Sequence, residues 1–150
     1  MKHDSTIDTL NHKKRINELL IMAANELLSR AVKHDNSKLE YPEKPLFDEF
    51  THQLGKCTYG STEYTDFLLK LKPALDHHYA HNSHHPEHYK NGINDFDIFD
   101  LVEMFFDWKA SSERQHNGNI HKSIEANGKR FDMSNQLQDI FANTAKRIKY

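Results

Sequence analysis

Apolar residues recur every three or four positions over much of this chain, which is the spacing of a helix that buries one face. The longest such stretch runs from Thr9 to Lys33, and its apolar positions are Ile16, Leu19, Leu20, Ala23, Leu27 and Ala31. From residue 36 to residue 61 the pattern loosens, and only a short helix near residues 46–54 is expected before Gly55.

Further helices are predicted in the rest of the chain. One begins near Ser61, with Glu63 in its first turn, where negative charge suits the helix dipole, and Pro73 should kink or split it. Others begin within residues 94–97, cover residues 120–127, and start at Ser134. No stretch alternates apolar and polar residues as a half-buried strand does. The prediction is therefore an all-α fold, with residues 1–150 forming a single domain of five or six helices.

Composition excludes several classes of protein. The 150 residues carry 20 Lys and Arg against 22 Asp and Glu, a net charge of -2, which argues against a protein that grips duplex nucleic acid. The longest apolar run, Leu19 to Ala24, is too short to cross a membrane, and no signal peptide pattern opens the chain. The single cysteine, Cys57, excludes an internal disulfide and a zinc site of several thiolates. A cytoplasmic protein with no membrane partner is expected.

Histidine is the residue type that suggests chemistry. Six of the 12 His lie between His77 and His88, and another is followed directly by an aspartate in the segment H-D-N-S-K-L at residues 34–39. An imidazole beside a carboxylate can offer nitrogen and oxygen donors to one divalent cation. The competing interpretation is the end of a helix followed by a turn.

The histidine-rich segment has two interpretations as well. If the segment from Asp76 onward is helical, His78 continues the apolar stripe of Tyr64, Leu68, Leu71 and Leu75 and points inward, while Pro86 biases His85 away from helical geometry. A metal role for at least one of the six is favoured over a solvated polar surface. Downstream, three carboxylates share one helical stripe, which is either a solvated acidic face or a group relieved by a cation. They are Asp100, Glu103 and Asp107.

The order of these pieces resembles the HD-domain superfamily of metal-dependent phosphohydrolases. H-D-N-S-K at residues 34–38 is similar to that family's H-D-x-G-K, and H-H-P-E at residues 84–87 is similar to the H-H-E segment of its cyclic-dinucleotide phosphodiesterase branch. More narrowly, the chain resembles an uncharacterised family common in phages and bacteria. The shared motifs are H-D-N-S-K-L, Y-G-S-T-E-Y, H-H-Y-A-H-N-S-H-H-P-E-H-Y and D-L-V-E-M-F-F-D-W-K-A.

The superfamily resemblance implies a hydrolase acting on a small phosphorylated molecule, foremost a nucleotide, with one or two divalent ions (Mn, Fe, Mg, Co or Zn). Its implied ligands are His12, His34, Asp35, His78, His84, His85 and Asp107, with Asp100 as the alternative to the last. Lys38 would hold a phosphate oxygen, and Glu87 would move protons.

Two other functions stay open, and the assignment of His12 as a ligand depends on whether the first helix is continuous. A non-haem di-iron oxygenase would use the same ligand set, and a non-enzymatic phage protein could bind a structural metal or interact with a host partner. His12 and His34 are 22 residues apart. If one unbroken helix joins them, they lie about 33 Å apart and cannot share an ion.

Overall fold

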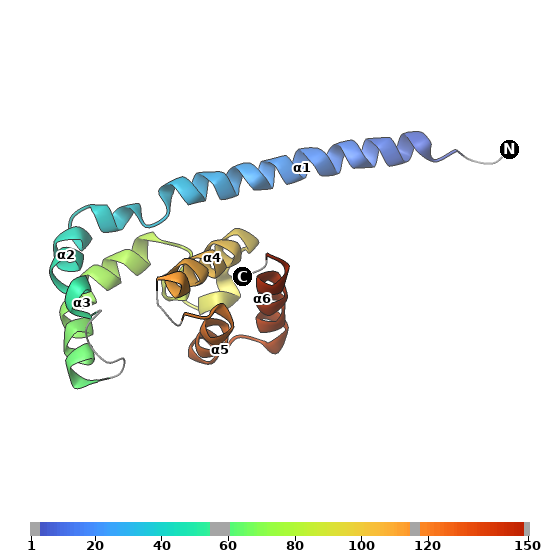
Figure 1. Ribbon diagram of the computed structural model, residues 1–150. Helices are drawn as coiled ribbons and strands as arrows, with labels where there is room; N and C mark the ends of the chain where they lie inside the picture. The colour runs from blue at the N-terminus through green and yellow to red at the C-terminus, as the bar shows by residue number, and fades with distance from the viewer. Residues whose placement is uncertain (1–3, 55–60, 115–117, 149–150) are drawn as a thin grey trace. The chain divides into compact units, whose positions relative to one another are not determined.

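The computed structural model describes residues 4–54, 61–114 and 118–148, which are helical almost throughout (Figure 1). Cys57 and part of the Y-G-S-T-E-Y motif lie outside these ranges. The α-helices are α1 (Thr6–Lys33), α2 (Glu43–Leu54), α3 (Thr62–His81), α4 (Ile98–Glu113), α5 (Ile120–Arg130) and α6 (Asn135–Arg147). Three short 3-10 helices connect them: η1 (Asn36–Leu39), η2 (Pro86–His88) and η3 (Gly92–Asp95). These ranges contain no strand, so the all-α prediction is confirmed.

The chain divides into two compact units, residues Met1–His34 and Asp35–Tyr150. The treatment of residues 1–150 as one metal-binding domain stays a prediction. None of the helices in the described ranges combines the length and the hydropathy that a membrane span requires.

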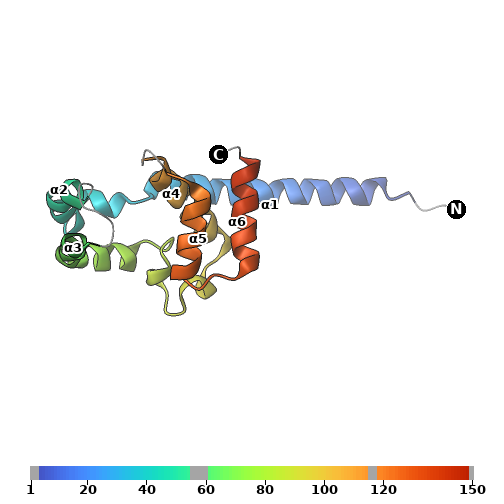
Figure 2. The same cartoon turned by 60° about the horizontal axis from the view of Figure 1, so that its bottom comes forward.

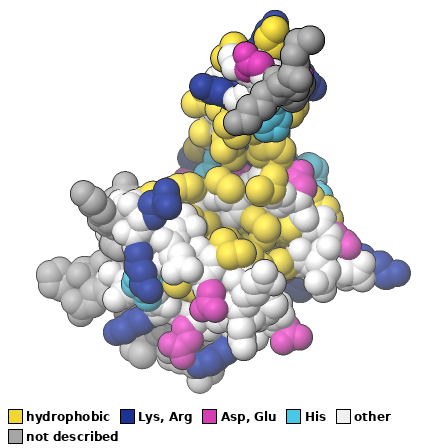
Figure 3. Space-filling view, turned by 90° about the vertical axis from the view of Figure 1, so that its right-hand side faces the viewer, with side chains coloured by type: hydrophobic (Ala, Val, Ile, Leu, Met, Phe, Trp, Pro, Cys, Tyr) yellow, Lys and Arg dark blue, Asp and Glu magenta, His cyan; other side chains and the backbone are white. Residues whose placement is uncertain are grey.

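The first unit is the helix α1, which continues for 28 residues without a break. None of its residues is buried within the unit, and Leu20, Met22 and Val32 are among its exposed apolar side chains. Figure 3 shows hydrophobic side chains on the surface of this helix. Because α1 is unbroken, His12 and His34 lie about 33 Å apart along one helix. His12 therefore cannot bind the same ion as His34, and its place in that ligand set is corrected.

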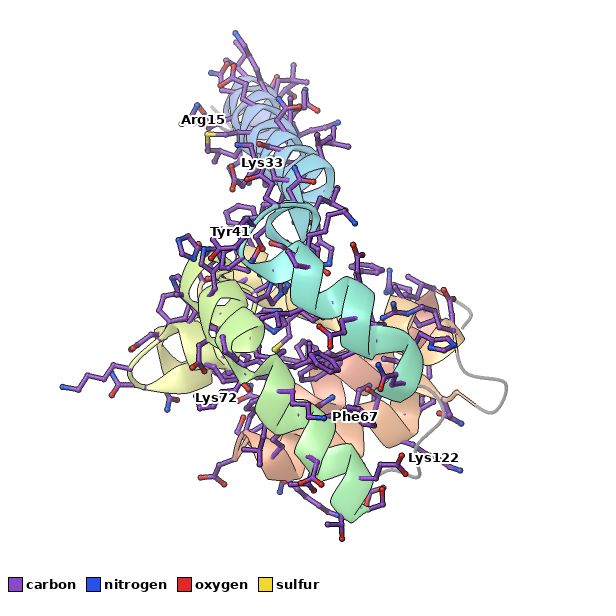
Figure 4. The ribbon with its side chains drawn as sticks, turned by 90° about the vertical axis from the view of Figure 1, so that its left-hand side faces the viewer. Arg15, Lys33, Tyr41, Phe67, Lys72 and Lys122 are labelled. Carbon is purple, nitrogen blue, oxygen red and sulfur yellow. The ribbon has the colours of Figure 1, made fainter. Side chains whose placement is uncertain are left out.

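In the second unit, α2 and α3 pack side by side (Figure 4). Phe50 and Phe67 meet there with ring centroids 6.0 Å apart, and Leu71 and Ala74 are buried. Pro73 is exposed within α3, and the helix is one element on both sides of it, so the predicted split does not occur. This packing presents the last turn of α3, with its histidines, to the first turn of α2.

Helices α4, α5 and α6 surround the largest apolar core, and Figure 2 shows α5 beside α6. Its buried members are Met104, Phe105, Ile120, Ile124, Met133, Phe141 and Ala145. The starts of these helices agree with the sequence prediction because polar caps define them. Asp97, Asn119 and Ser134 each accept backbone N–H groups of the first turn. The cap at Asp97 sets the register in which α4 carries its acidic stripe.

Candidate metal centre

Four side chains of the second unit converge on one point. They are Asp35, His78, His84 and His85, and one donor atom from each lies within 4.8 Å of the others. The Nε2 atom of His78 is 3.2 Å from Oδ1 of Asp35 and 2.9 Å from Nε2 of His85. The Nε2 atom of His84 is 3.6 Å from the same Oδ1. Donors about 2.1 Å from one ion are about 3.0 Å apart at right angles and about 3.4 Å apart at tetrahedral angles. The four side chains can therefore hold a metal ion.

Asp35 is presented by an unusual turn of the backbone. It stands between α1 and η1 with φ 57° and ψ 13°, in the left-handed region that Asp tolerates better than most residues. Three residues later, Lys38 donates a hydrogen bond of 2.6 Å to its Oδ2 atom. With Oδ2 bound by the ammonium group, Oδ1 is directed toward the imidazoles, and it is buried from solvent.

His78 comes from the last turn of α3 and is only 1 % exposed. Its Nδ1 atom lies 2.9 Å from Oε2 of Glu43 and 3.0 Å from Nδ2 of Asn82. In the tautomer with the proton on Nδ1, this nitrogen donates to the carboxylate and the lone pair of Nε2 faces the centre. A carboxylate behind an imidazole is the arrangement that orients histidine ligands and raises their basicity in metal proteins.

His84 has the same arrangement with a different carboxylate. Its Nδ1 atom lies 3.2 Å from Oε1 of Glu103 on α4, and the residue is 2 % exposed. Two of the three imidazoles are thus oriented by buried or nearly buried carboxylates from two different helices.

The three carboxylates of the acidic stripe on α4 make different contacts. Asp100, 1 % exposed, accepts hydrogen bonds from Ser83 Oγ at 2.6 Å and from Tyr89 Oη at 3.0 Å, so it fixes the loop that carries the histidines. Asp107 lies one helical turn beyond Glu103, and one of its carboxylate oxygens is within 4.8 Å of a carboxylate oxygen of Asp35. Of the two candidates for the late acidic ligand, Asp107 is the one beside the centre.

His85 completes the group as a neutral side chain. Burial, together with the neighbouring rings of His84 and His78, lowers the pKa of His85 to about 3 against the opposing charge of Asp107. At neutral pH the ring therefore carries no charge and keeps a lone pair for a ligand.

Sequence reasoning missed one supporting residue of the centre, Glu43, and named another, Glu103, without recognising its role. Glu43 is completely buried and also accepts from His77 Nδ1, at 2.7 Å. In the sequence it is only a glutamate between Pro42 and Pro45. Glu103 was visible as a member of the acidic stripe, but periodicity alone could not tell its role from a solvated face.

The remaining predicted residues have these positions. Lys38 is bonded to Asp35, and Glu87 on η2 accepts from Arg130 at 2.7 Å. His34 ends the first unit, directly before Asp35 in the chain. The serine in place of the superfamily's glycine, Ser37, accepts from Asn82 Nδ2 at 2.8 Å, beside His78.

A cavity of about 560 Å³ adjoins the centre. His85, Glu87 and Asp107 line one part of it. Tyr79 also lines it, and burial raises the pKa of its hydroxyl, with the charge of Glu87 adding to the effect and Arg130 opposing it. A small molecule in this cavity would contact a candidate ligand, His85, directly.

Comparison with known proteins adds a family but no activity. Residues 1–148 match the pattern of a family of unknown function (DUF5662). No curated protein and no solved structure matches the chain.

Proposed function

The chain belongs to DUF5662, and we propose its function from the site itself: it binds a divalent transition-metal ion and hydrolyses a small phosphorylated molecule, foremost a nucleotide. One observation carries this proposal. Three imidazole nitrogens and a carboxylate oxygen, from Asp35, His78, His84 and His85, lie within 4.8 Å of one another beside a cavity of a small molecule's size. The resemblance of H-D-N-S-K to the HD-domain motif supports the choice of reaction.

The donor set bears on the identity of the ion. Imidazole suits iron and zinc, whereas Mg²⁺ prefers oxygen and water. Three nitrogens to one oxygen therefore favour Fe, Co or Zn over Mg at this group. The neighbouring carboxylates of Asp35 and Asp107 would accommodate a second ion, since oxygens within 4.8 Å of each other can share one.

In such an enzyme the ion would lower the pKa of a water molecule and neutralise charge on the phosphoryl oxygens. The chain's own residues supply the rest. Glu43 and Glu103 would orient His78 and His84 as ligands, because each carboxylate lies next to the Nδ1 atom of its histidine. Lys38 has two ammonium protons besides the one it gives to Asp35, and these can hold a phosphate oxygen. Positioning and charge then provide most of the catalysis, as phosphoryl transfer requires.

A proton carrier would have to reach the cavity. Glu87 and Asp107 both line it together with His85. Either carboxylate could accept the proton of the attacking water and return it to the leaving group. The proton-transfer role predicted for Glu87 is compatible with its place in the cavity lining, and Asp107 is the other candidate for that role.

An oxygenase with two iron ions is the second candidate, because the same nitrogen and oxygen donors suit iron. Iron content and visible absorption distinguish it from a hydrolase. A protein in which the metal serves only structure or partner binding would hold the ion and turn over no ester.

The test begins with elemental analysis of protein purified without an affinity tag. Wild type and the control Asp48→Ala, whose carboxylate is exposed and pairs with Lys44, should carry near-stoichiometric metal. Asp35→Ala should lose most of it. Stoichiometric metal in Asp35→Ala would overturn the assignment of the site. The metal-loaded wild type is then assayed against a panel of nucleotides and sugar phosphates, and hydrolysis of none of them would overturn the assignment of the reaction.

A further inference from the structure

An ion pair lies on the wall of the cavity beside the metal centre. Arg130, the last residue of α5, donates from its guanidinium to Oε1 of Glu87 at 2.7 Å, across 43 positions of sequence. Both residues line the cavity together with His85 and Asp107. A guanidinium group therefore shares this cavity with two residues of the candidate centre.

The position of that guanidinium is supported from a second side. Its Cζ atom lies 4.7 Å from the ring centroid of Phe131, and Phe131 packs against the core of α4, α5 and α6. Stacking of this kind restricts the side chain before any ligand binds. Less ordering is then required when an anion arrives.

The carboxylate partner of Arg130, Glu87, is replaceable. Side-chain exposure is 58 % for Arg130 and 29 % for Glu87, and pairs this exposed contribute little to stability. A phosphate presents to a guanidinium the same geometry as a carboxylate, with more charge. A phosphate in the cavity can therefore take the place of Glu87.

A second cation lies on the same helix. Lys122 lines the cavity eight residues before Arg130, about 12 Å along α5 (Figure 4). Its exposed ammonium and the guanidinium border one space whose wall also includes Trp108. Without an anion the lining holds two cations, Lys122 and Arg130, against two carboxylates, Glu87 and Asp107.

We propose that Arg130, assisted by Lys122, is the phosphate receptor of this cavity, and that Glu87 occupies the receptor until a phosphorylated substrate displaces it. This inference rests on the proposed function for its substrate, but it assigns residues that neither the motifs nor the metal centre indicates. It also gives Glu87 a role distinct from proton transfer: the carboxylate competes with the substrate for one guanidinium.

The experiment is a titration with inorganic phosphate, followed by phosphorus NMR, on metal-loaded and on chelator-treated protein. Inorganic phosphate is the product of any phosphomonoester hydrolysis and is not consumed. Arg130→Gln should raise its Kd at least about 10-fold in both states, the effect of losing a hydrogen bond to a charged group. The Kd of Arg130→Lys should be intermediate, because lysine keeps the positive charge but cannot form the paired hydrogen bonds of a guanidinium group. Glu87→Gln should lower the Kd about 3-fold, since an exposed competing pair is removed.

The matched control is Lys129→Gln, which removes one positive charge from the neighbouring position, where the side chain pairs with Glu125 outside the cavity lining. It should leave the Kd within twofold of wild type. Circular dichroism and thermal unfolding on every variant check that the fold is kept. Equal Kd values for wild type and Arg130→Gln, or a Glu87→Gln variant that binds phosphate no more tightly, would overturn the inference. Metal content is measured on the same samples. A protein that binds no metal but still binds phosphate through Arg130 would refute the proposed metal-dependent hydrolysis and support the phosphate receptor.

Discussion

Replacing Glu43 by Gln tests the metal centre without touching a ligand. Glu43 is completely buried, and its two oxygens lie 2.7 Å from His77 Nδ1 and 2.9 Å from His78 Nδ1. A glutamine has the same shape but only one carbonyl oxygen, so one imidazole N–H would face an amide group that donates.

Two magnitudes follow from this geometry. Removing a carboxylate that orients a histidine ligand lowers metal affinity about 10- to 100-fold, or about 1.4 to 2.7 kcal/mol. Leaving one buried donor without an acceptor lowers the free energy of unfolding of the metal-free protein by about 1 to 3 kcal/mol. The two effects concern the same side chain but different measurements.

The assay is a competitive titration of Zn²⁺ with a chromophoric chelator, accompanied by urea unfolding of the metal-free protein. Glu49→Gln is the control, because Glu49 is an exposed glutamate on the same helix. It should change neither quantity measurably. If Glu43→Gln binds Zn²⁺ within twofold of wild type while remaining folded, the carboxylate does not support a ligand, and the role assigned to Glu43 is refuted.

The remaining predictions concern single residues. Lys38→Ala should keep its metal content and fold but lose turnover on the order of 10²-fold; equal turnover in matched, metal-loaded samples would leave Lys38 as a surface charge, and loss of metal would make it a support of Asp35. Asp100→Asn should lower the free energy of unfolding by about 1 to 3 kcal/mol, because the buried carboxylate anchors the histidine loop; unchanged urea unfolding would contradict that role. Compared with Asp100→Asn, Asp107→Asn should lower the free energy of unfolding less and turnover more. The reverse ranking would exchange the roles assigned to Asp100 and Asp107. Chelation should lower the thermal midpoint of wild type, since an ion that binds only the folded state stabilises it, and an equal midpoint with and without chelator would argue against a bound ion.

The helices of this protein follow from local sequence, and the candidate site follows from it only in part. Periodicity and caps such as Asp97 and Ser134 act within one helix, so the starts of α4 and α6 could be predicted. Residue type marked His78, His84 and Asp35 as donors, because the chemistry of an imidazole or a carboxylate belongs to the residue. A stripe of apolar positions also showed that His78 points inward.

Tertiary packing decided which donors meet and what supports them. Glu43 lies 34 and 35 positions from the histidines it binds, and nothing in its neighbourhood in the chain indicates that contact. Asp100 and Asp107 lie on one helix with the same chemistry, and only the loop packed against α4 gives the first to Ser83 and places the second near Asp35. Local sequence specifies which side chains share one face of a helix. The partner of that face depends on how helices distant in the chain pack together, since an ion or a substrate needs donors from several of them at one point.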